Sequence, residues 1–397
     1  MPLAVFLGHY FDQRVFLDAG YLVNAGLNPY QQHAVDVFSS NSYLNGVNPV
    51  IGYPPPWTLL LGLIYRLTYN LTGNLFLYNF ATKIPIIAAN IALAYATKAV
   101  MQKQHMPQKT VRFAWLFMLF NPFTLLTTVA WGQFDTLVAL LCVVGVYLLS
   151  QAKIAESALL LSLSLVLKPI SFPLLGLPLL YASKATQKKA AAAAVTMAVV
   201  LALWFLPFYL FGWASPMSSD EVGSYFRLAG GMTLFNLVDV FSKTSNMPSG
   251  LLFLGYLWIP LLVAGFFWVY RRKPRSMVDL AECAVVLLLI FFLSRSWLSE
   301  QNLNLLFPFL LILVGAGILS VRRFHWAWIV PLAFLVLNAS LPQLFFLVYP
   351  PVIPLKEAFD VEFGTARLAA RFAVTVVWYV VALGILLKIG SKYPCRG

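Results

Sequence analysis

The sequence predicts an all-α, polytopic membrane protein, and three observations lead to that fold class. Of its 397 residues, 60% are hydrophobic and 10% are charged, whereas about a quarter of the residues in a soluble domain are charged. Several apolar runs reach the roughly 20 residues that one helix needs to cross a bilayer. The alternation of apolar and polar residues that a membrane barrel requires is absent. We therefore expect a single transmembrane domain over residues 1–397.

The apolar runs predict about nine full spans and one broken pair of helices. The pair covers residues 155–183, where two half-length runs meet at Lys168 and Pro169, because proline interrupts a helix. The shorter run 57–72 contains Arg66 and is expected to be re-entrant rather than spanning. The nine spans are predicted at residues 76–100, 112–130, 135–152, 190–212, 250–270, 277–295, 302–321, 325–348 and 372–390.

The long outer segments are predicted at residues 8–56, 213–249 and 349–371, and the first of them is expected to form a helix that lies on the membrane surface. Apolar residues between Val15 and Leu22 recur at helical spacing, and Gly26 and Pro29 end the pattern. The opening "MPLAVFLG" is too short to span a bilayer. Either the chain begins outside, or this sequence lacks most of a first helix.

Basic residues predict which side of the protein is cytoplasmic. They gather in short loops on one side of the predicted topology, and the positive-inside rule makes that side cytoplasmic. The net charge of +13 therefore reflects topology and gives no support to a nucleic-acid-binding function. The three cysteines have no disulfide or metal-ligand spacing. The basic residues of these loops include Lys98, Lys103, Lys109, Arg112, Lys153, Lys184, Lys188, Lys189, Arg271, Arg272, Lys273, Arg275, Arg322, Arg323, Lys388, Lys392 and Arg396.

Asp12 is the first acidic residue of the chain and stands at the start of the predicted surface helix. Two interpretations remain open for it. An aspartate at a helix start commonly caps free backbone N–H groups. A carboxylate on the outer side of a membrane enzyme can also act as a general base.

Two further motifs place polar residues where spans meet the outer surface. Gln133 and Asp135 follow Gly132 in a turn, where they either complete that turn or bind a sugar hydroxyl or a phosphate-bound cation. Lys168 lies between two apolar runs, where a lysine is costly and requires an anionic partner or access to the interface.

A third outer turn contains Arg295, Glu300 and Gln301. Two interpretations are open for this turn. Arg295 and Glu300 either form an exposed ion pair that contributes little to stability, or they bind a ligand. Together the three motifs supply carboxylates, amides, aromatic rings and cations above an apolar body. That mixture suits a lipid-linked phosphate sugar, with cations at the phosphate and one carboxylate activating the acceptor hydroxyl.

The order of these motifs resembles the GT-C superfamily of polytopic glycosyltransferases that use polyprenyl-phosphate sugars. Within it the sequence resembles the mannosyltransferase that adds the first mannose of the glycosylphosphatidylinositol anchor, and its prokaryotic polyprenyl-phosphate-mannose-dependent relatives. The family motif has a second acid two residues before its aspartate, where this sequence has Tyr10. The matching stretches are "VFLDA" (15–19) preceded by Asp12, "GLNPY" (26–30), "GYPPPW" (52–57), "WGQFD" (131–135), "LKPISFP" (167–173) and "SEQN" (299–302).

The resemblance implies an inverting transfer of mannose, or a related hexose, from a polyprenyl-phosphate donor such as dolichyl phosphate mannose. The acceptor would be a glycan, a glycolipid or a protein on the non-cytoplasmic face, of the plasma membrane in a prokaryote or of the endoplasmic reticulum in a eukaryote. Asp12 matches the catalytic base, and Asp18 is expected to be structural. No cofactor is certain, and a divalent cation remains open. The expected substrate-binding residues are Gln133, Asp135, Lys168, Arg295, Glu300 and Gln301.

Two other function classes compete with this hypothesis. A transporter or flippase for lipid-linked saccharides would also have many spans and a charged residue at a broken helix. A scaffold without chemistry would tolerate any substitution of the outer acids. The transporter interpretation predicts polar groups along a path to both faces, whereas the cytoplasmic loops are short and merely basic.

Overall fold

The computed structural model describes residues 2–38, 42–182, 187–213, 229–237, 249–338 and 341–391. The strands in these residues form two minimal pairings, β1 (Ala34–Val35) antiparallel with β2 (Gly46–Val47) and β3 (Gly230–Gly231) parallel with β4 (Trp297–Leu298). The other regular elements are helices, so the predicted all-α class is confirmed. The α-helices are α1 (Pro2–Phe6), α2 (Tyr10–Asn24), α3 (Pro55–Leu67), α4 (Tyr69–Thr72), α5 (Leu75–Lys103), α6 (Gln108–Phe120), α7 (Pro122–Leu125), α8 (Asp135–Ser150), α9 (Ile154–Leu167), α10 (Gly176–Ala182), α11 (Gln187–Phe211), α14 (Trp258–Arg272), α15 (Met277–Ser294), α16 (Phe307–Gly315), α17 (Val321–Asn338) and α18 (Val352–Gly390).

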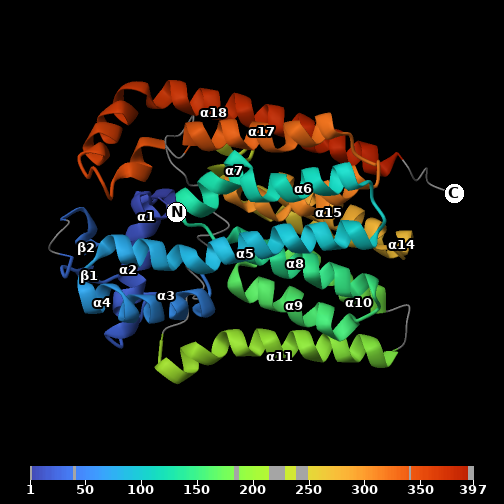
Figure 1. Ribbon diagram of the computed structural model, residues 1–397, viewed down its shortest axis with the longest axis horizontal. Helices are drawn as coiled ribbons and strands as arrows, with labels where there is room; N and C mark the ends of the chain where they lie inside the picture. Colours follow the sequence, from blue (N-terminus) through green and yellow to red (C-terminus); the bar gives the residue numbers. More distant parts are fainter. Residues whose placement is uncertain are drawn as a thin grey trace.

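Six helices of the described chain are long and apolar enough to cross a bilayer, which makes this a multi-pass membrane protein. In Figure 1 these helices run side by side along the molecule. Helix α11 lies at one edge, and α18 lies at the other edge beside the shorter α17. The six are Leu75–Lys103, Gln108–Trp131, Gln187–Phe211, Phe253–Arg272, Met277–Ser294 and Val352–Gly390.

Three of the nine predicted spans are shorter in the structure than the sequence suggested. The runs 135–152 and 302–321 form the apolar helices Asp135–Ser150 and Glu300–Gly315, and α17 ends ten residues before the predicted limit of 325–348. The first two lie in the centre of the bundle, where the residues of Glu300–Gly315 are almost all buried and those of Asp135–Ser150 are buried or half-buried. A helix surrounded by protein can end before the bilayer surface, so hydropathy alone overestimated its length.

The predicted broken pair is confirmed. Helix α9 ends at Leu167, Lys168 is extended, and a 3₁₀ segment from Pro169 to Leu174 leads into α10. The run 57–72 forms α3 and α4, which pack beside α2 at one end of the bundle (Figure 1). At Gly62 an added Cβ would lie 2.4 Å from Val23, so only glycine allows α2 and α3 to approach this closely.

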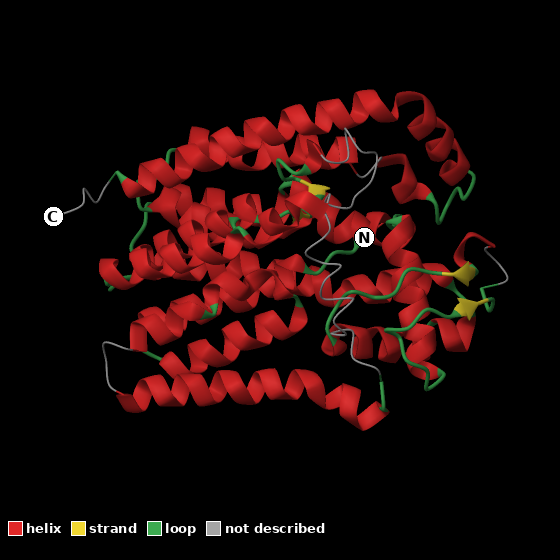
Figure 2. Ribbon diagram, turned by 180° about the vertical axis from the view of Figure 1, so that it is seen from behind, coloured by secondary structure: helices red, strands yellow, loops and turns green. Residues whose placement is uncertain are grey.

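The last helix differs most from the predicted topology. The sequence placed an outer segment at 349–371 before a span at 372–390, but α18 is one helix of 39 residues, about 58 Å at 1.5 Å per residue. A bilayer core is only about 30 Å thick. Figures 1 and 2 show that the first turns of α18 curve around the end of the molecule that contains β1 and β2. Good helix formers such as Leu368, Ala369 and Ala370 allow the helix to continue without a break.

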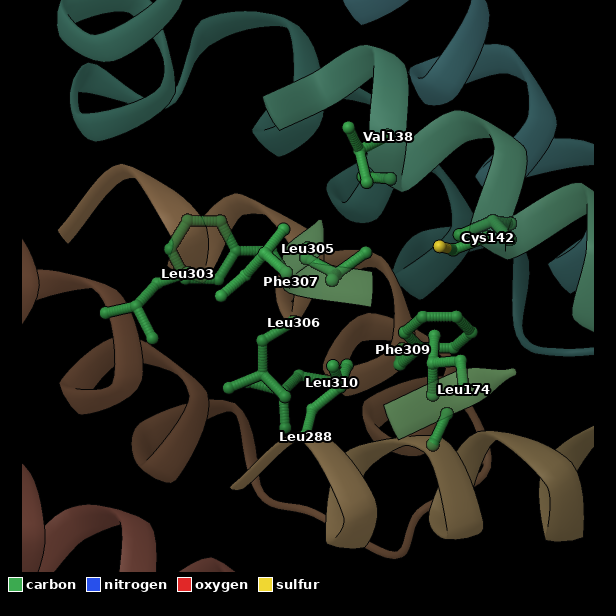
Figure 3. Close-up of a cluster of buried hydrophobic side chains, with 14 of the residues drawn as sticks. Val138, Cys142, Leu174, Leu288, Leu303, Leu305, Leu306, Phe307, Phe309 and Leu310 are labelled. Carbon is green, nitrogen blue, oxygen red and sulfur yellow. The ribbon is translucent and has the colours of Figure 1, made fainter. Parts of the chain in front are cut away.

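The hydrophobic core lies where α8, α15 and α16 meet. The side chains of α15 and α16 are almost entirely buried, and the core contains both free cysteines of the described chain, Cys142 and Cys283. Packed apolar side chains make this centre rigid, so it can hold polar groups in fixed positions at its end. The residues labelled in Figure 3 are Val138, Cys142, Leu174, Leu288, Leu303, Leu305, Leu306, Phe307, Phe309 and Leu310.

The two ends of the bundle differ in composition. One end carries α1 to α4 with β1 and β2, and the C-terminus lies at the opposite end (Figure 1). The basic residues Lys103, Lys153 and Arg272 stand at or beside helix ends on the side of the C-terminus. The segments 214–228 and 238–248, most of the second predicted outer loop, are outside the described residues, as are Lys184, Lys392 and Arg396.

Candidate active site

Asp12 lies in the first turn of α2, but its side chain does not cap that helix. His9 occupies the N-cap position and makes no side-chain cap. The Asp12 carboxylate instead contacts a distant turn, where Trp131 and Gln133 both donate to its Oδ2 atom, Gln133 at 2.9 Å. The capping interpretation of Asp12 is therefore wrong, and the residue is part of a buried polar network.

The turn that reaches Asp12 is built by an irregular helix end. Residues Leu126–Trp131 form a π-helical segment, a geometry that often occurs at functional sites. Gly132 ends the segment with a φ of +99°, which glycine adopts without strain. The predicted turn at Gly132 is thus confirmed. It directs the indole of Trp131 and the amide of Gln133 toward Asp12.

His9 completes the surroundings of the carboxylate. Its Nδ1 lies 3.2 Å from Asp12 Oδ2, and its ring stacks on Trp131 with centroids 4.1 Å apart. On the other side of the ring, Gln343 Nε2 lies 3.1 Å from His9 Nε2. The donors described for Asp12 all converge on Oδ2, which leaves Oδ1 for another partner.

These contacts decide the charge of Asp12. Burial alone would raise the pKa of the carboxyl, but the interaction with His9 and the hydrogen bonds from Trp131 and Gln133 lower it below its ordinary value of 3.8. Asp12 is therefore ionised at neutral pH. A buried carboxylate with an unengaged oxygen can accept a proton from a hydroxyl group placed beside it.

A second charged pair lies directly next to Asp12. Lys168 Nζ donates to Asp135 Oδ2 at 2.8 Å and to Gln133 Oε1 at 3.2 Å. Tyr53 also donates to Gln133 Oε1, at 3.2 Å, and its ring lies under the ammonium together with the ring of Phe134. Gln133 thus bonds Asp12 through its nitrogen and Lys168 through its oxygen. The anionic partner that the sequence required for Lys168 is Asp135.

The contacts described for the third predicted motif are with other groups, although the charge of Glu300 interacts with His9. Glu300 is buried and accepts both hydrogen bonds from Asn338 Nδ2, at 2.9 and 3.1 Å, so it is not half of an exposed pair with Arg295. The guanidinium of Arg295 lies 4.9 Å from the centroid of the Phe291 ring. Gln301 is buried, and its Oε1 has no hydrogen-bond partner among the described residues.

Asp18 faces away from this network, on another side of α2. It lines a small recess of about 10 Å³ together with His33, Asn48 and Pro49. Burial raises the pKa of Asp18 to about 7, although a hydrogen bond with Asn48 and the charge of Arg14 act in the opposite direction. The structural role expected for Asp18 remains a prediction.

Sequence reasoning missed several residues that build the site. His9 and Lys83 were not singled out, and Tyr53 and Trp131 appeared only inside the matching stretches "GYPPPW" and "WGQFD". A histidine three residues before Asp12 and a lysine inside the predicted span 76–100 were signals available in the sequence. In the part of the chain that the structure describes, no group of three or more His, Cys, Asp or Glu side chains could hold a metal ion.

Comparison with known proteins identifies the family. Residues 52–296, more than half of the chain, match the family described as glycosyltransferase family 87. The chain belongs to glycosyltransferase family 87. Membership confirms the predicted enzyme class, and it places Gln133, Asp135 and Lys168 inside the matched region, whereas Asp12 precedes it.

Among solved structures, the chain is similar to that of ArnT from Cupriavidus metallidurans bound to undecaprenyl phosphate. The identity is 16% and the TM-score is 0.48, over 98% of this chain and 73% of the ArnT chain. No curated protein sequence matches this chain.

Proposed function

We propose that this member of glycosyltransferase family 87 transfers mannose, or a related hexose, from a polyprenyl-phosphate donor to an acceptor hydroxyl with inversion. The observation that supports it is the junction at Gln133, which bonds the ionised Asp12 and the cationic Lys168 at once. The Gln133 amide thus holds a base and a phosphate-binding cation side by side. This arrangement suits a reaction in which a hydroxyl group displaces the phosphate from a sugar phosphate.

In this reaction the acceptor oxygen attacks the anomeric carbon and forms the new C–O bond. The bond from that carbon to the phosphate oxygen breaks, and polyprenyl phosphate leaves with the electron pair. Asp12 accepts the hydroxyl proton on Oδ1, because its Oδ2 is engaged by Trp131 and Gln133. The phosphate is a stable leaving group, so no general acid is needed.

Lys168 serves as the phosphate contact. Its ammonium is already oriented by Asp135, Gln133 and the ring of Tyr53, and a phosphate oxygen would take a further hydrogen bond from it. Arg295 is the second candidate cation for the phosphate.

An apolar groove offers space for the polyprenyl chain. It has a volume of about 450 Å³ and is lined by α14, α15 and α18, including Trp268, Ile290 and Ser294. Ser294 directly precedes Arg295, so one end of the groove lies beside that cation. Aromatic rings in edge-to-face contact then lead toward the site, because Phe291 contacts Trp258 and Trp258 contacts Phe172, four residues after Lys168.

Unsatisfied acceptors support recognition of the sugar or of the acceptor. Asp135 Oδ1 and Gln301 Oε1 are buried without a hydrogen-bond partner among the described residues. Such atoms are costly unless a ligand supplies donors, which hexose hydroxyls can do. Glu300 is held by Asn338 and borders the same region.

The non-cytoplasmic face is the proposed location of the reaction. The basic helix ends named above lie on the side of the C-terminus, and the positive-inside rule assigns that side to the cytoplasm. The Asp12 network belongs to the opposite end, with α2 and α3 (Figure 1). The acceptor would be a glycan, a glycolipid or a protein on that face.

The test uses membranes that contain the wild-type chain and polyprenyl-phosphate sugars with a labelled mannose or glucose. Transfer of label to an acceptor is expected from the mannosyl donor, and Asp12→Asn at equal protein level should abolish it. Asp18→Asn, on another side of the same helix, is the matched control and should retain transfer.

Absence of transfer from every polyprenyl-phosphate sugar, by wild-type chain that is present and folded, would overturn the proposal. Movement of the labelled lipid between leaflets without transfer would instead support a flippase, for which the apolar groove is the structural argument.

A further inference from the structure

A buried lysine lies behind the candidate active site, in a position that the proposed reaction does not use. Lys83 belongs to α5 and is 0% exposed. In the described parts of the chain it makes no ion pair with a carboxylate. Burying a cation without a counter-ion is expensive, so an intramembrane lysine usually has a function.

The partners of Lys83 are backbone carbonyl groups from two different segments. Its Nζ donates to the carbonyl oxygen of Leu7 and, at 2.9 Å, to that of Ala130. Leu7 stands two residues before His9, and Ala130 directly precedes Trp131. The ammonium therefore joins the two segments whose rings stack beside Asp12.

The side chain of Lys83 also packs against the turn of the site. A Cβ built on Gly132 would lie 3.2 Å from Lys83 Cε, so the aliphatic chain is in close contact with that glycine. Gly132 separates Trp131 from Gln133, the two donors to Asp12. Lys83 therefore holds this turn in two ways, through packing against Gly132 and through the hydrogen bond to the carbonyl of Ala130.

Asn79, one helical turn earlier on α5, holds the other side of the segment. Its Nδ2 donates to the carbonyl oxygens of Ala4, Val5 and Leu7, and its Oδ1 accepts from Gln13 at 2.5 Å. Gln13 is the neighbour of Asp12. One face of α5 thus fixes the chain on both sides of His9.

We propose that Lys83 is a positioning residue, which clamps the His9 segment to the Trp131 turn so that their side chains hold the Asp12 carboxylate in its reactive orientation. This inference rests on the proposed transfer reaction. In the described chain no hydrogen bond or ion pair joins Lys83 to Asp12, so Lys83 acts through the backbone of Leu7 and Ala130 and not as a catalytic group.

A lysine suits this position better than an apolar residue of equal length. One ammonium can donate to carbonyls of two different segments, whereas methionine would remove both hydrogen bonds and leave the Leu7 carbonyl only the one from Asn79. Misplacing a catalytic group by about 1 Å can cost about 100-fold in rate. Substitution should therefore affect turnover more than binding of the donor.

The experiment compares Lys83→Met with Lys98→Met on purified chain in lipid nanodiscs. Lys98 is another lysine of α5, which lies over the ring of Trp115, far along the helix from the site. We expect Lys83→Met to lower kcat by about 10- to 100-fold with little change in KM for the donor. Lys98→Met should keep the wild-type kcat.

A pH profile separates positioning from a general loss of structure. The titratable groups around Asp12 are His9 on its own segment, Lys83 on α5, Lys168 and Asp135 beyond Gln133, and Glu300, whose charge interacts with His9. If the donors to Asp12 move away, the acid limb of kcat/KM should shift to higher pH by about one unit.

Lys83→Gln is made in parallel, because it retains a side-chain N–H donor and removes the charge. Should Lys83→Met fail to accumulate, Lys83→Gln carries the test, with an expected kcat between those of the methionine variant and wild type. Variants with wild-type kcat and an unshifted acid limb would overturn the inference while leaving the transfer reaction established. No transfer by wild type would instead overturn the proposed function on which the inference rests.

Discussion

The two aspartates of α2 are six residues apart and have opposite protonation behaviour. Asp12 is buried beside His9 and accepts from Trp131 and Gln133 of one distant turn, and these contacts lower its pKa despite burial. Asp18 is buried beside Asn48 and Arg14, and burial dominates, raising its pKa to about 7. The same residue type on one helix is therefore a carboxylate at one position and is half protonated near neutral pH at the other.

This difference shows that burial alone does not make a base. Asp18 lacks the converging N–H groups that stabilise negative charge, and its Oδ1 has no hydrogen-bond partner in the described chain. Asp12 has the indole of Trp131 and the amide of Gln133. The four predictions that follow test this contrast, beginning with the largest expected effect.

Replacing Asp12 with asparagine should lower kcat about 10³-fold, within the range that general-base groups contribute. The amide has nearly the same shape, so the chain should fold and bind the donor. Kinetics with a polyprenyl-phosphate sugar, at protein levels checked by immunoblot, measures this effect. A variant with full activity would exclude Asp12 as the base.

Lys168→Met should lower kcat/KM for the donor by about 10- to 100-fold, because a charged hydrogen bond to the phosphate is lost. It should also reduce thermal stability, since the buried Asp135 loses its counter-ion. The double variant Lys168→Met with Asp135→Leu should regain the melting temperature but not the activity. Recovery of both would mean that the pair is structural only.

Trp131→Phe should remove one hydrogen bond from Asp12 while keeping the ring that stacks on His9. Because fewer donors stabilise the carboxylate, the pKa of Asp12 should rise toward its ordinary value, and activity should be lost at a higher pH on acidification. At pH 7 Asp12 stays ionised, so kcat should fall by less than about tenfold. An acid limb of kcat/KM identical to wild type would show that the indole does not set this pKa.

Asp18→Asn should leave transfer within about twofold of wild type. Between its ordinary pKa of 3.8 and about 7, the folded chain keeps a proton on Asp18 that the unfolded chain has released. Unfolding then releases a proton, so wild-type stability falls as the pH rises through this window. The asparagine variant should therefore melt a few degrees higher than wild type at pH 8 and equally near pH 4. Equal melting at both pH values would contradict the raised pKa.

The sequence predicted those elements of the fold that depend on the residues of one continuous stretch of chain. Long apolar runs such as 76–100 and 277–295 became helices α5 and α15, and the proline after Lys168 broke its helix as expected. It failed where neighbours decide length, at the short buried helix Glu300–Gly315, and it did not predict that the helix of the last span begins as early as Val352. Hydropathy measures the transfer of a segment into lipid, not its burial against other helices.

The site was predicted by residue type but not by contact. Asp12, Gln133, Asp135 and Lys168 were named from the sequence, and the structure brings them together. Arg295 was assigned with them, but these hydrogen bonds do not connect it to the network. Lys83 was overlooked because it lies within an apolar run, although a lysine there is itself a signal.

The sequence by itself determined that this chain is a bundle of membrane helices and that a few polar residues stand at the ends of its apolar runs, because hydropathy and helix-breaking residues act locally. Only the tertiary structure decided which of two aspartates is ionised and which lysine meets which acceptor. Those outcomes depend on groups brought together from distant segments, 33 residues apart for Lys168 and Asp135 and 119 for Trp131 and Asp12, and no local pattern encodes such contacts.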